Sequence, residues 1–327
     1  MSDQLVTFAG GSATVAPLGV GAWAWGDSST WGMGTYDQDL SEDTIAQAVD
    51  ASIAAGVTMI DTAEGYGNGE SERIIGRLMA ADPVRRERLT IATKFIPMPW
   101  KLDVRGALRA SLEASLERLG VDQVELYQIH GPISLRSNKA LAAALAAVVA
   151  DGLPKSVGVS NYSVNEMTQM HRALGEHGVP LASNQIEFSL LRRRPETSGL
   201  IGACHEMGVV PLAYSPIGQG RLTGKYSAAS PPPGKRGFSA HPMEQVDAVV
   251  GVTRTIGETH GRTPSEVALR WLIQKGAVPI PGAKNADQAT QNAGALGWEL
   301  SATDMSTLDA AALEGTNSLA NRIWQHG

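Results

Sequence analysis

The chain of 327 residues contains a single cysteine, Cys204, and no apolar run as long as about 18 residues. One cysteine excludes an intrachain disulfide and a cysteine-based zinc site. The lack of a long apolar run argues against a membrane-spanning helix, and the amino-terminal stretch has neither the basic nor the apolar segment of a secretion signal. We therefore expect no metal, no membrane association and a cytoplasmic location.

Positive charge is also in short supply. The 27 Lys and Arg residues are outnumbered by 33 Asp and Glu residues, which gives a formal net charge of -6. No overall basic field would attract nucleic acid, so we expect a small-molecule substrate instead. Hydrophobic residues make up 43% of the chain, which is ordinary for a globular protein with a large core. We expect a monomer or a weak homo-oligomer.

Short apolar runs alternate with helical patterns along the chain. After a β-hairpin expected at 5–8 and 13–16, the strands are predicted at 18–21, 57–61, 89–94, 124–130, 156–160, 181–185, 209–215 and 277–282. Helices with clear caps or apolar periodicity are predicted at 41–56, 103–120, 138–150, 164–175, 198–207, 264–274 and 286–296.

Strands separated by helices imply parallel βαβ units. Eight such units favour a (β/α)8 TIM barrel with an N-terminal β-hairpin and an additional C-terminal helix. No linker divides the sequence, so residues 1–327 are interpreted as one domain. The Pro- and Gly-rich segment 227–242 is predicted to be a long loop, and such loops are often functional.

Polar groups stand at the carboxyl ends of the predicted strands. They are Asp61, Lys94, His130, Ser160, Asn161, Gln185, Tyr214 and Ser215. In a (β/α)8 barrel these ends converge on one face, where active sites of this fold are built. Each residue alone has a bland structural explanation, but the recurrence on successive strands predicts a site.

Tyr66 follows the strand that ends at Asp61, between Gly65 and Gly67, which would let the backbone turn. A phenol has an ordinary pKa near 10, and a nearby ammonium such as that of Lys94 would lower it. Asp61 can pair with the buried ammonium, and His130 can donate to the same oxygen position. The alternative is a bracing ion pair between Lys94 and Asp61, with Tyr66 as a surface aromatic.

The motifs "MIDTAEGYGNGESERIIGR", "IATKF", "LYQIH", "VGVSNYS", "NQIEFSLL", "LAYSPIGQGRLTGKY" and "PIPGAKNADQATQN" together resemble the aldo-keto reductases. The start of the chain is most similar to a plant and cyanobacterial branch. The resemblance implies a barrel that binds NADP(H) without a Rossmann domain, and the G-x-G-x-x-G spacing is indeed missing. It implies reduction of aldehydes and ketones to alcohols by hydride transfer. In that reaction Tyr66 is the general acid, tuned by Lys94 and Asp61, and His130 orients the carbonyl.

The resemblance also implies a set of cofactor-binding residues. Near the first strands these are Gly21, Ala22, Trp23 and Asp61, and Ser160, Asn161 and Gln185 would bind the nicotinamide carboxamide. Tyr214 would stack on the ring, and Ser215, Pro216, Ile217, Gly218, Gly220, Arg221, Leu222 and Lys225 would form the loop over the pyrophosphate. Arg236, Gly282, Lys284, Gln288, Gln291 and Asn292 would bind the adenosine end. Gln288 stands where some members have arginine, but Lys284 and Arg236 favour NADP(H) over NAD(H).

Tryptophans are expected to line an apolar substrate pocket; they are Trp25, Trp31, Trp100 and Trp324. Two other functions stay open. One is an NADP(H)-binding redox-sensing or regulatory subunit with little turnover. The other is a cofactor-free barrel isomerase or lyase that uses Lys94 as a Schiff base.

Overall fold

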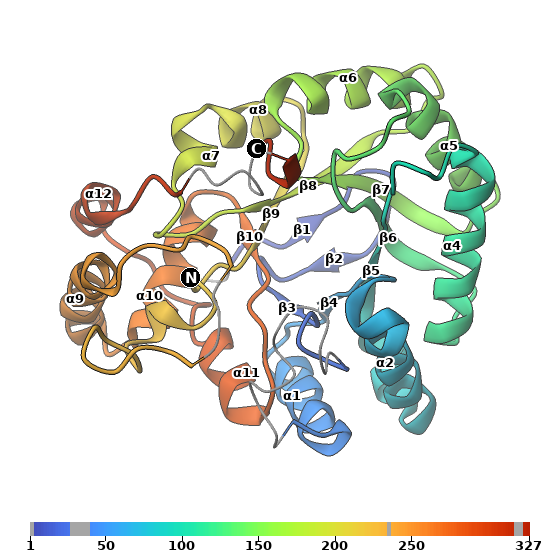
Figure 1. The fold of residues 1–327 in the computed structure, drawn as a ribbon. Helices are drawn as coiled ribbons and strands as arrows, with labels where there is room; N and C mark the ends of the chain where they lie inside the picture. The colour runs from blue at the N-terminus through green and yellow to red at the C-terminus, as the bar shows by residue number, and fades with distance from the viewer. Residues whose placement is uncertain (1–2, 27–39, 234–236, 317–322) are drawn as a thin grey trace.

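Eight parallel strands form the centre of the computed structural model, which describes residues 3–26, 40–233, 237–316 and 323–327 (Figure 1). The strands are β3 (Gly19–Gly21), β4 (Met59–Asp61), β5 (Thr90–Phe95), β6 (Val124–Ile129), β7 (Pro154–Ser160), β8 (Leu181–Glu187), β9 (Val210–Tyr214) and β10 (Val278–Pro279). They pair in chain order, and a bridge between Gly21 and Gly282 joins the two ends of the sheet. This confirms the predicted (β/α)8 barrel.

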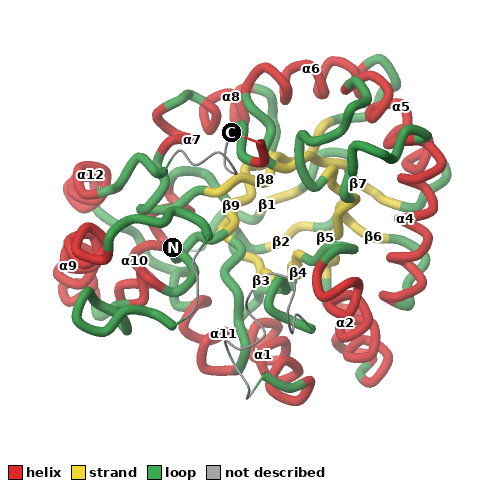
Figure 2. The backbone as a smooth tube through the Cα atoms, viewed as in Figure 1, coloured by secondary structure: helices red, strands yellow, loops and turns green. Residues whose placement is uncertain are grey.

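Helices surround the strands on the outside, as Figure 2 shows. They are α1 (Glu42–Ala54), α2 (Glu70–Ala81), α3 (Pro83–Arg88), α4 (Val104–Leu119), α5 (Asn138–Ala150), α6 (Val164–Gly175), α7 (Arg194–Thr197), α8 (Leu200–Glu206), α9 (Met243–His260), α10 (Pro264–Gln274), α11 (Ala286–Ala293) and α12 (Ala302–Ala311). The last of these is the additional C-terminal helix that the sequence predicts. Within the described ranges, no helix is both long and apolar enough to cross a bilayer.

The N-terminal hairpin closes the amino end of the barrel. Its strands β1 (Val6–Thr7) and β2 (Thr14–Val15) pair antiparallel. Phe8 and Val15 are buried against Met59, Leu126 and Leu212, which come from three different barrel strands. The hairpin thus fills the bottom of the barrel and leaves the carboxyl ends of the strands as the open side.

Helix α4 shows how directly the local sequence sets an element. The Asp103 side chain accepts a hydrogen bond from the backbone of Gly106 at 3.1 Å and so caps the first turn. Gly120 ends the helix at φ +65°, a conformation that favours glycine. The predicted leucine stripe, Leu108, Leu112, Leu116 and Leu119, is buried against the barrel.

Several elements differ from the expectation. The helix predicted at 198–207 is observed as α8 (Leu200–Glu206), because Gly199 at φ +84° separates it from the preceding α7. The helix predicted at 286–296 is α11, which ends at Ala293. Helices α2, α3, α7 and α9 have no counterpart among the predicted helices. In α9 the buried stripe is largely Val246, Val249 and Val250, and β-branched residues weaken a helical signal.

Candidate active site

Asp61, Tyr66, Lys94 and His130 come together at the carboxyl ends of β4, β5 and β6. The Lys94 Nζ lies 2.5 Å from Asp61 Oδ1, donates to the Thr62 carbonyl at 2.7 Å, and lies 3.3 Å from the Tyr66 hydroxyl. The Tyr66 and His130 rings meet edge-on, with centroids 5.6 Å apart. The phenol oxygen therefore stands beside the ammonium, with the imidazole packed against its ring.

A tight turn places Tyr66 over the barrel. The short helix η1 (Tyr66–Gly69) contains Gly67 at φ +56° and Asn68 at φ +53°. Gly65, in contrast, has an ordinary φ of −84°, so its role is spatial. A Cβ atom there would lie 2.5 Å from Ile96 Cδ1. Gly67 therefore supplies the turn, and Gly65 leaves room for the Ile96 side chain.

The orientation of Asp61 is fixed by two glutamines. Its second oxygen, Oδ2, accepts from Gln185 Nε2 at 2.8 Å and from Gln128 Nε2 at 3.3 Å. Gln128 in turn accepts from the Ser183 hydroxyl at 3.2 Å. Gln128 is absent from the sequence-based candidates. It lies on β6, two positions before His130, so the two side chains face the same side of the sheet.

The expected acidification of the phenol is wrong for this structure. Burial, reinforced by the negative charge of Asp61, raises the pKa of Tyr66 well above its usual value. The ammonium does not reverse this, because it is paired with the carboxylate and the pair carries no net charge. Burial also lowers the pKa of Lys94, against the opposing pull of Asp61. Burial and the Lys94 charge hold the pKa of His130 well below its usual range. The phenol is thus protonated and the imidazole neutral near pH 7.

The residues expected at the carboxamide form one hydrogen-bonded group. The Ser160 hydroxyl donates to the Gln185 carbonyl at 2.9 Å and accepts from Asn161 Nδ2 at 3.2 Å. The Tyr214 hydroxyl donates to Asn161 Oδ1 at 3.0 Å. Asn161 has φ +61°, a left-handed conformation that asparagine adopts more readily than most residues.

The loop after β9 is held closed by its own side chains. The Arg221 guanidinium is buried and donates to the carbonyls of Gly218 at 2.8 Å, Ser239 at 2.6 Å and Phe238. Leu222 packs in the hydrophobic core. The sequence assigns both residues to the loop over the pyrophosphate, and in the structure their side chains hold the shape of that loop. Of the remaining loop residues, Pro216 and Gly218 are buried, Ser215, Ile217 and Gly220 are half-buried, and Lys225 is exposed.

The loop before α11 is built from the predicted adenosine-binding residues. Asn292 donates to the Gly282 carbonyl at 3.2 Å, and the Gln288 side chain accepts from the Lys284 backbone at 3.1 Å. Asn285 caps α11. Gln291, on α11, is half-buried. Two of the predicted polar side chains thus hold the loop's shape.

The residues after β3 lie on the other side of that loop. The Gly21 backbone donates to the Pro281 carbonyl at 3.0 Å, and Ala22 is buried and donates to the Asp61 carbonyl at 2.8 Å. Trp23 meets Phe238 edge-on at 5.8 Å between centroids. Phe238 is a second residue that sequence reasoning did not identify.

The tryptophans divide into three groups. Trp25 does not line an open pocket, because its side chain is fully buried and its indole donates to the Ala283 carbonyl at 2.8 Å. Trp100 is 71% exposed. Trp324 lies 5.6 Å from the His130 ring, centroid to centroid, and so borders the site. Trp31 and the expected phosphate contact Arg236 lie outside the described residues.

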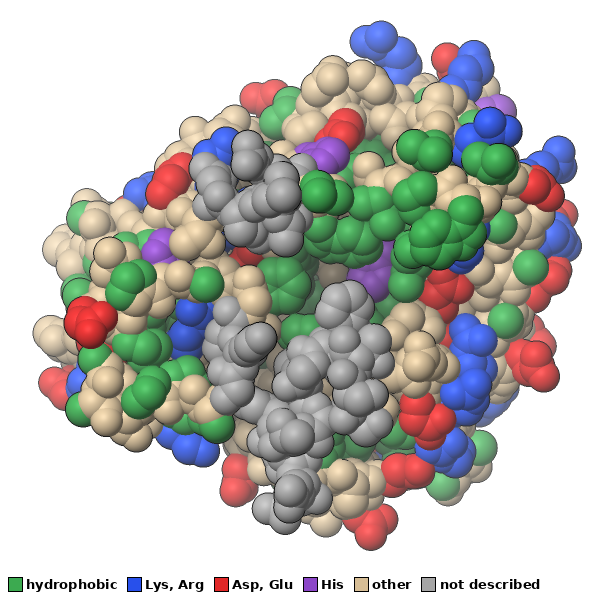
Figure 3. All heavy atoms as spheres, viewed as in Figure 1, with side chains coloured by type: hydrophobic (Ala, Val, Ile, Leu, Met, Phe, Trp, Pro, Cys, Tyr) green, Lys and Arg blue, Asp and Glu red, His purple; other side chains and the backbone are tan. Residues whose placement is uncertain are grey.

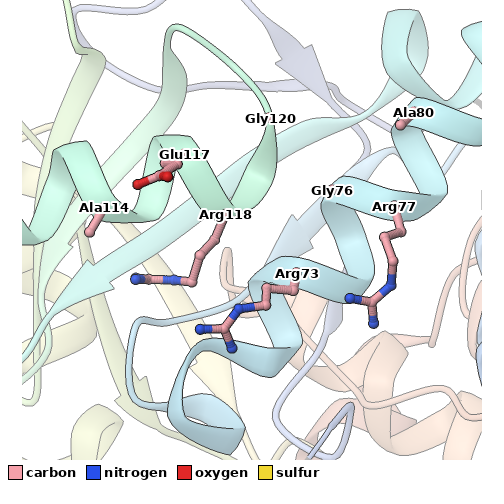
Figure 4. Close-up of a pocket in the computed structure, with 8 residues that line it drawn as sticks. All are labelled: Arg73, Gly76, Arg77, Ala80, Ala114, Glu117, Arg118 and Gly120. Atoms are coloured by element: carbon pink, nitrogen blue, oxygen red, sulfur yellow. The ribbon is translucent and has the colours of Figure 1, made fainter.

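A hollow of about 530 Å³ on the outer surface, between α2 and α4, is a different feature (Figure 4). Its arginines are paired with carboxylates: Arg77 with Glu42 and Glu70, each at 2.7 Å, and Arg118 with Glu72 at 2.7 Å. These pairs leave little net charge to attract an anion. Across the described part of the chain, no group of three or more His, Cys, Asp or Glu residues is arranged to hold a metal ion.

The structure is a (β/α)8 barrel with tyrosine, lysine, aspartate and histidine gathered at one mouth. This is the arrangement expected for the class of oxidoreductase that the sequence motifs indicate. The chain belongs to the Aldo/keto reductase family, whose profile matches residues 17–313. It is 35% identical over 326 residues to the chloroplastic pyridoxal reductase of Arabidopsis thaliana, covering 96% of this chain and 88% of that protein. It is 34% identical over 310 residues to an uncharacterized oxidoreductase of Mycobacterium tuberculosis, covering 92% and 91%.

Two solved structures show the same architecture. The glycerol dehydrogenase of Gluconobacter oxydans superposes with a TM-score of 0.81 at 25% identity, covering 98% of this chain and 99% of that one. An aldo-keto reductase of Klebsiella pneumoniae in complex with NADPH has a TM-score of 0.75 at 26% identity, covering 97% and 98%. The chain is therefore an oxidoreductase of the aldo-keto reductase type, acting on carbonyl or alcohol groups.

Proposed function

We propose that this enzyme reduces aldehydes and ketones to alcohols with NADPH, and that Tyr66 gives the proton to the carbonyl oxygen. The observation that carries the proposal is the Tyr66 hydroxyl, which lies 3.3 Å from the Lys94 Nζ. When bound, the cofactor supplies the hydride to the carbonyl carbon.

The raised pKa of Tyr66 fits this role. A general acid must hold its proton until charge develops on the substrate oxygen. Once the proton leaves, the phenolate is stabilised by the adjacent Lys94 ammonium, which Asp61 holds in place. A neutral His130 can bind and orient the carbonyl without competing as an acid.

The residues around the mouth fit NADP(H). Ser160, Asn161 and Gln185 offer buried hydroxyl and amide groups for a carboxamide, and Tyr214 offers an aromatic face. Positive φ values at Ser215, Gly218, Gln219 and Gly220 curve the following loop, and its glycines would let the backbone approach a phosphate closely. The NADPH complex of the Klebsiella relative supports this assignment.

Preference for NADPH over NADH is proposed to depend on Lys284, which stands just before the N-terminus of α11, an end that itself favours anions. Lys284→Ala should raise the Kd for NADPH about tenfold and leave the Kd for NADH within about twofold, because a charged hydrogen bond is worth roughly 1.5–3 kcal/mol. Lys139→Ala, which removes an exposed lysine of α5, is the matched control. Equal losses for both cofactors would contradict the assignment.

Aromatic aldehydes are the proposed substrate class. Trp324 borders His130, so an aromatic side chain stands beside the proposed reacting centre. Figure 3 shows hydrophobic side chains gathered beside a histidine at this end of the barrel. The Arabidopsis relative is a pyridoxal reductase, so pyridoxal belongs in the first panel, with benzaldehydes and short aliphatic aldehydes.

The test is NADPH oxidation with this panel for wild type and Tyr66→Phe. We expect kcat to fall about 10²–10⁴-fold in the variant, the usual size of a general-acid contribution, while the Kd for NADPH changes less than about twofold. Tyr226→Phe, which removes a phenol outside the site, should be silent. NADPH binding without turnover in the wild type would favour the regulatory subunit, and the absence of NADPH binding would refute the proposal.

A further inference from the structure

Glu187 is a buried carboxylate that the chemistry above does not use. It ends β8, is 2% exposed, and pairs in register with Tyr214 of β9. It follows Gln185 by two positions, so both side chains face the same way, with Glu187 nearer the mouth. A buried carboxylate is costly unless its oxygens are hydrogen-bonded, so its partners are informative.

Those partners come from two segments far apart in the chain. One Glu187 oxygen accepts from the Ser239 hydroxyl, in the loop after β9. The other accepts from Gln325 Nε2 at 2.5 Å, in the C-terminal segment 323–327. The Arg192 Nε lies 3.8 Å from that second oxygen and offsets its charge.

The hydrogen bond to Ser239 connects Glu187 to the proposed cofactor groove. The Ser239 carbonyl accepts from the Arg221 guanidinium at 2.6 Å, and Ser239 itself has φ +46°, a strained conformation for a residue with a Cβ. The neighbouring Phe238 ring meets Tyr214 at 5.4 Å and Trp23 at 5.8 Å between centroids. The loop is thus held across the mouth partly by its bond to Glu187.

The hydrogen bond to Gln325 connects Glu187 to the proposed substrate pocket. Gln325 Nε2 also donates to the Tyr214 hydroxyl at 2.7 Å. The preceding residue, Trp324, lies against His130 and covers Gly131, where a Cβ atom would approach the indole to 3.2 Å. Anchoring Gln325 therefore sets the position of the indole that borders the reacting centre.

We propose that Glu187 is a positioning residue that couples the two halves of the site. By bonding Ser239 and Gln325 together, it links closure of the loop after β9 to docking of segment 323–327. Cofactor binding then favours carbonyl binding, and by linkage the reverse holds equally. This inference rests on the proposed function, because it assigns the loop to NADPH and the segment to the carbonyl substrate.

The test is a double-mutant cycle with Ser239→Ala and Gln325→Ala, measuring the Kd for NADPH and the KM for the aldehyde at saturating NADPH. Ser239→Ala should raise the aldehyde KM about fivefold or more, a typical coupling between sites, although it changes only the cofactor side. In the Gln325→Ala background that effect should disappear. Gln325 touches Tyr214 directly, so the decisive result is this non-additivity.

Two variants of Glu187 separate positioning from simple stability. Glu187→Leu should reproduce the double mutant, whereas Glu187→Gln can still accept from Gln325 and donate to Ser239, and should restore the wild-type KM within about twofold. Glu125→Leu removes a buried carboxylate at the other end of the barrel, bonded to the Ala13 backbone, and should leave the KM unchanged. If Glu187→Leu does not fold, the double-mutant cycle of Ser239 and Gln325 still tests the coupling.

Strictly additive effects in the cycle, or an aldehyde KM unmoved by Ser239→Ala, would overturn the coupling. A wild-type protein that neither binds NADPH nor reduces an aldehyde would instead overturn the proposed function. The two failures are therefore distinguishable.

Discussion

Replacing Lys94 with methionine should cost both stability and activity, and the structure sets the size of each loss. The side chain is 0% exposed and its ammonium lies 2.5 Å from Asp61. Methionine keeps the volume but leaves the carboxylate without its cation. Breaking one half of a buried ion pair costs about 3–5 kcal/mol, because the remaining charge is buried unpaired.

The lower end of that range applies here, since Asp61 keeps hydrogen bonds from Gln185 and Gln128. Unfolding entropies near 2.1 cal/mol/K per residue give roughly 0.7 kcal/mol/K for 327 residues. Lys94→Met should therefore lower Tm by about 4 °C. The catalytic loss should be about 10²–10⁴-fold in kcat, since the phenolate loses its stabilising charge.

Thermal unfolding and steady-state kinetics of the double variant separate these two effects. Adding Asp61→Asn to Lys94→Met removes the unpaired charge, so Tm should return to within about 2 °C of wild type while kcat stays low. Lys101→Met breaks a shallower pair with Glu64 at 3.4 Å and should cost less than about 1 kcal/mol. A Lys94→Met protein with wild-type Tm, or a double variant with restored kcat, would refute the reasoning.

Two further outcomes follow from the same geometry. Because the Tyr66 pKa is raised and the His130 pKa lowered, the phenol stays protonated and the imidazole neutral between about pH 6 and pH 8, so kcat/KM for reduction should be flat there. A fall as the pH rises through 7 would show instead that a protonated histidine is the acid. Trp324→Ala should raise the KM for aromatic aldehydes about tenfold by removing a buried aromatic contact, with the Kd for NADPH changed less than twofold. Trp100→Ala, at a side chain 71% exposed, should leave both constants unchanged, and equal losses in the two variants would contradict the assigned pocket wall.

The barrel was predictable because its signals are local. The leucine stripe of α4, its Asp103 cap and its Gly120 stop are each decided within a few residues. The order of strands follows from the βαβ rule, which brings Asp61, Lys94 and His130 to one mouth without knowledge of any contact. Helix α9 was missed because its buried face is made of valines, whose local preference is for strands.

The residues that sequence reasoning missed inside the site fall into two kinds. Gln128 and Glu187 were within reach, because each lies two positions from a recognised residue on the same strand and so shares its face. Gln325 was not, because its partner Glu187 is 138 positions away and the pairing depends on where the C-terminal segment lies. No local pattern encodes that placement.

The sign of the Tyr66 pKa shift was wrong for a related reason. The prediction considered only the phenol and the ammonium, and attraction between phenolate and cation would lower the pKa of the phenol. The structure adds two terms that a pair does not contain: the loss of water around the hydroxyl, and the carboxylate of Asp61 that cancels the ammonium's charge. With the pair neutral, desolvation decides, and the phenol keeps its proton. In the proposed mechanism, the lysine then acts chiefly at the moment of proton transfer, when negative charge first forms on the Tyr66 oxygen.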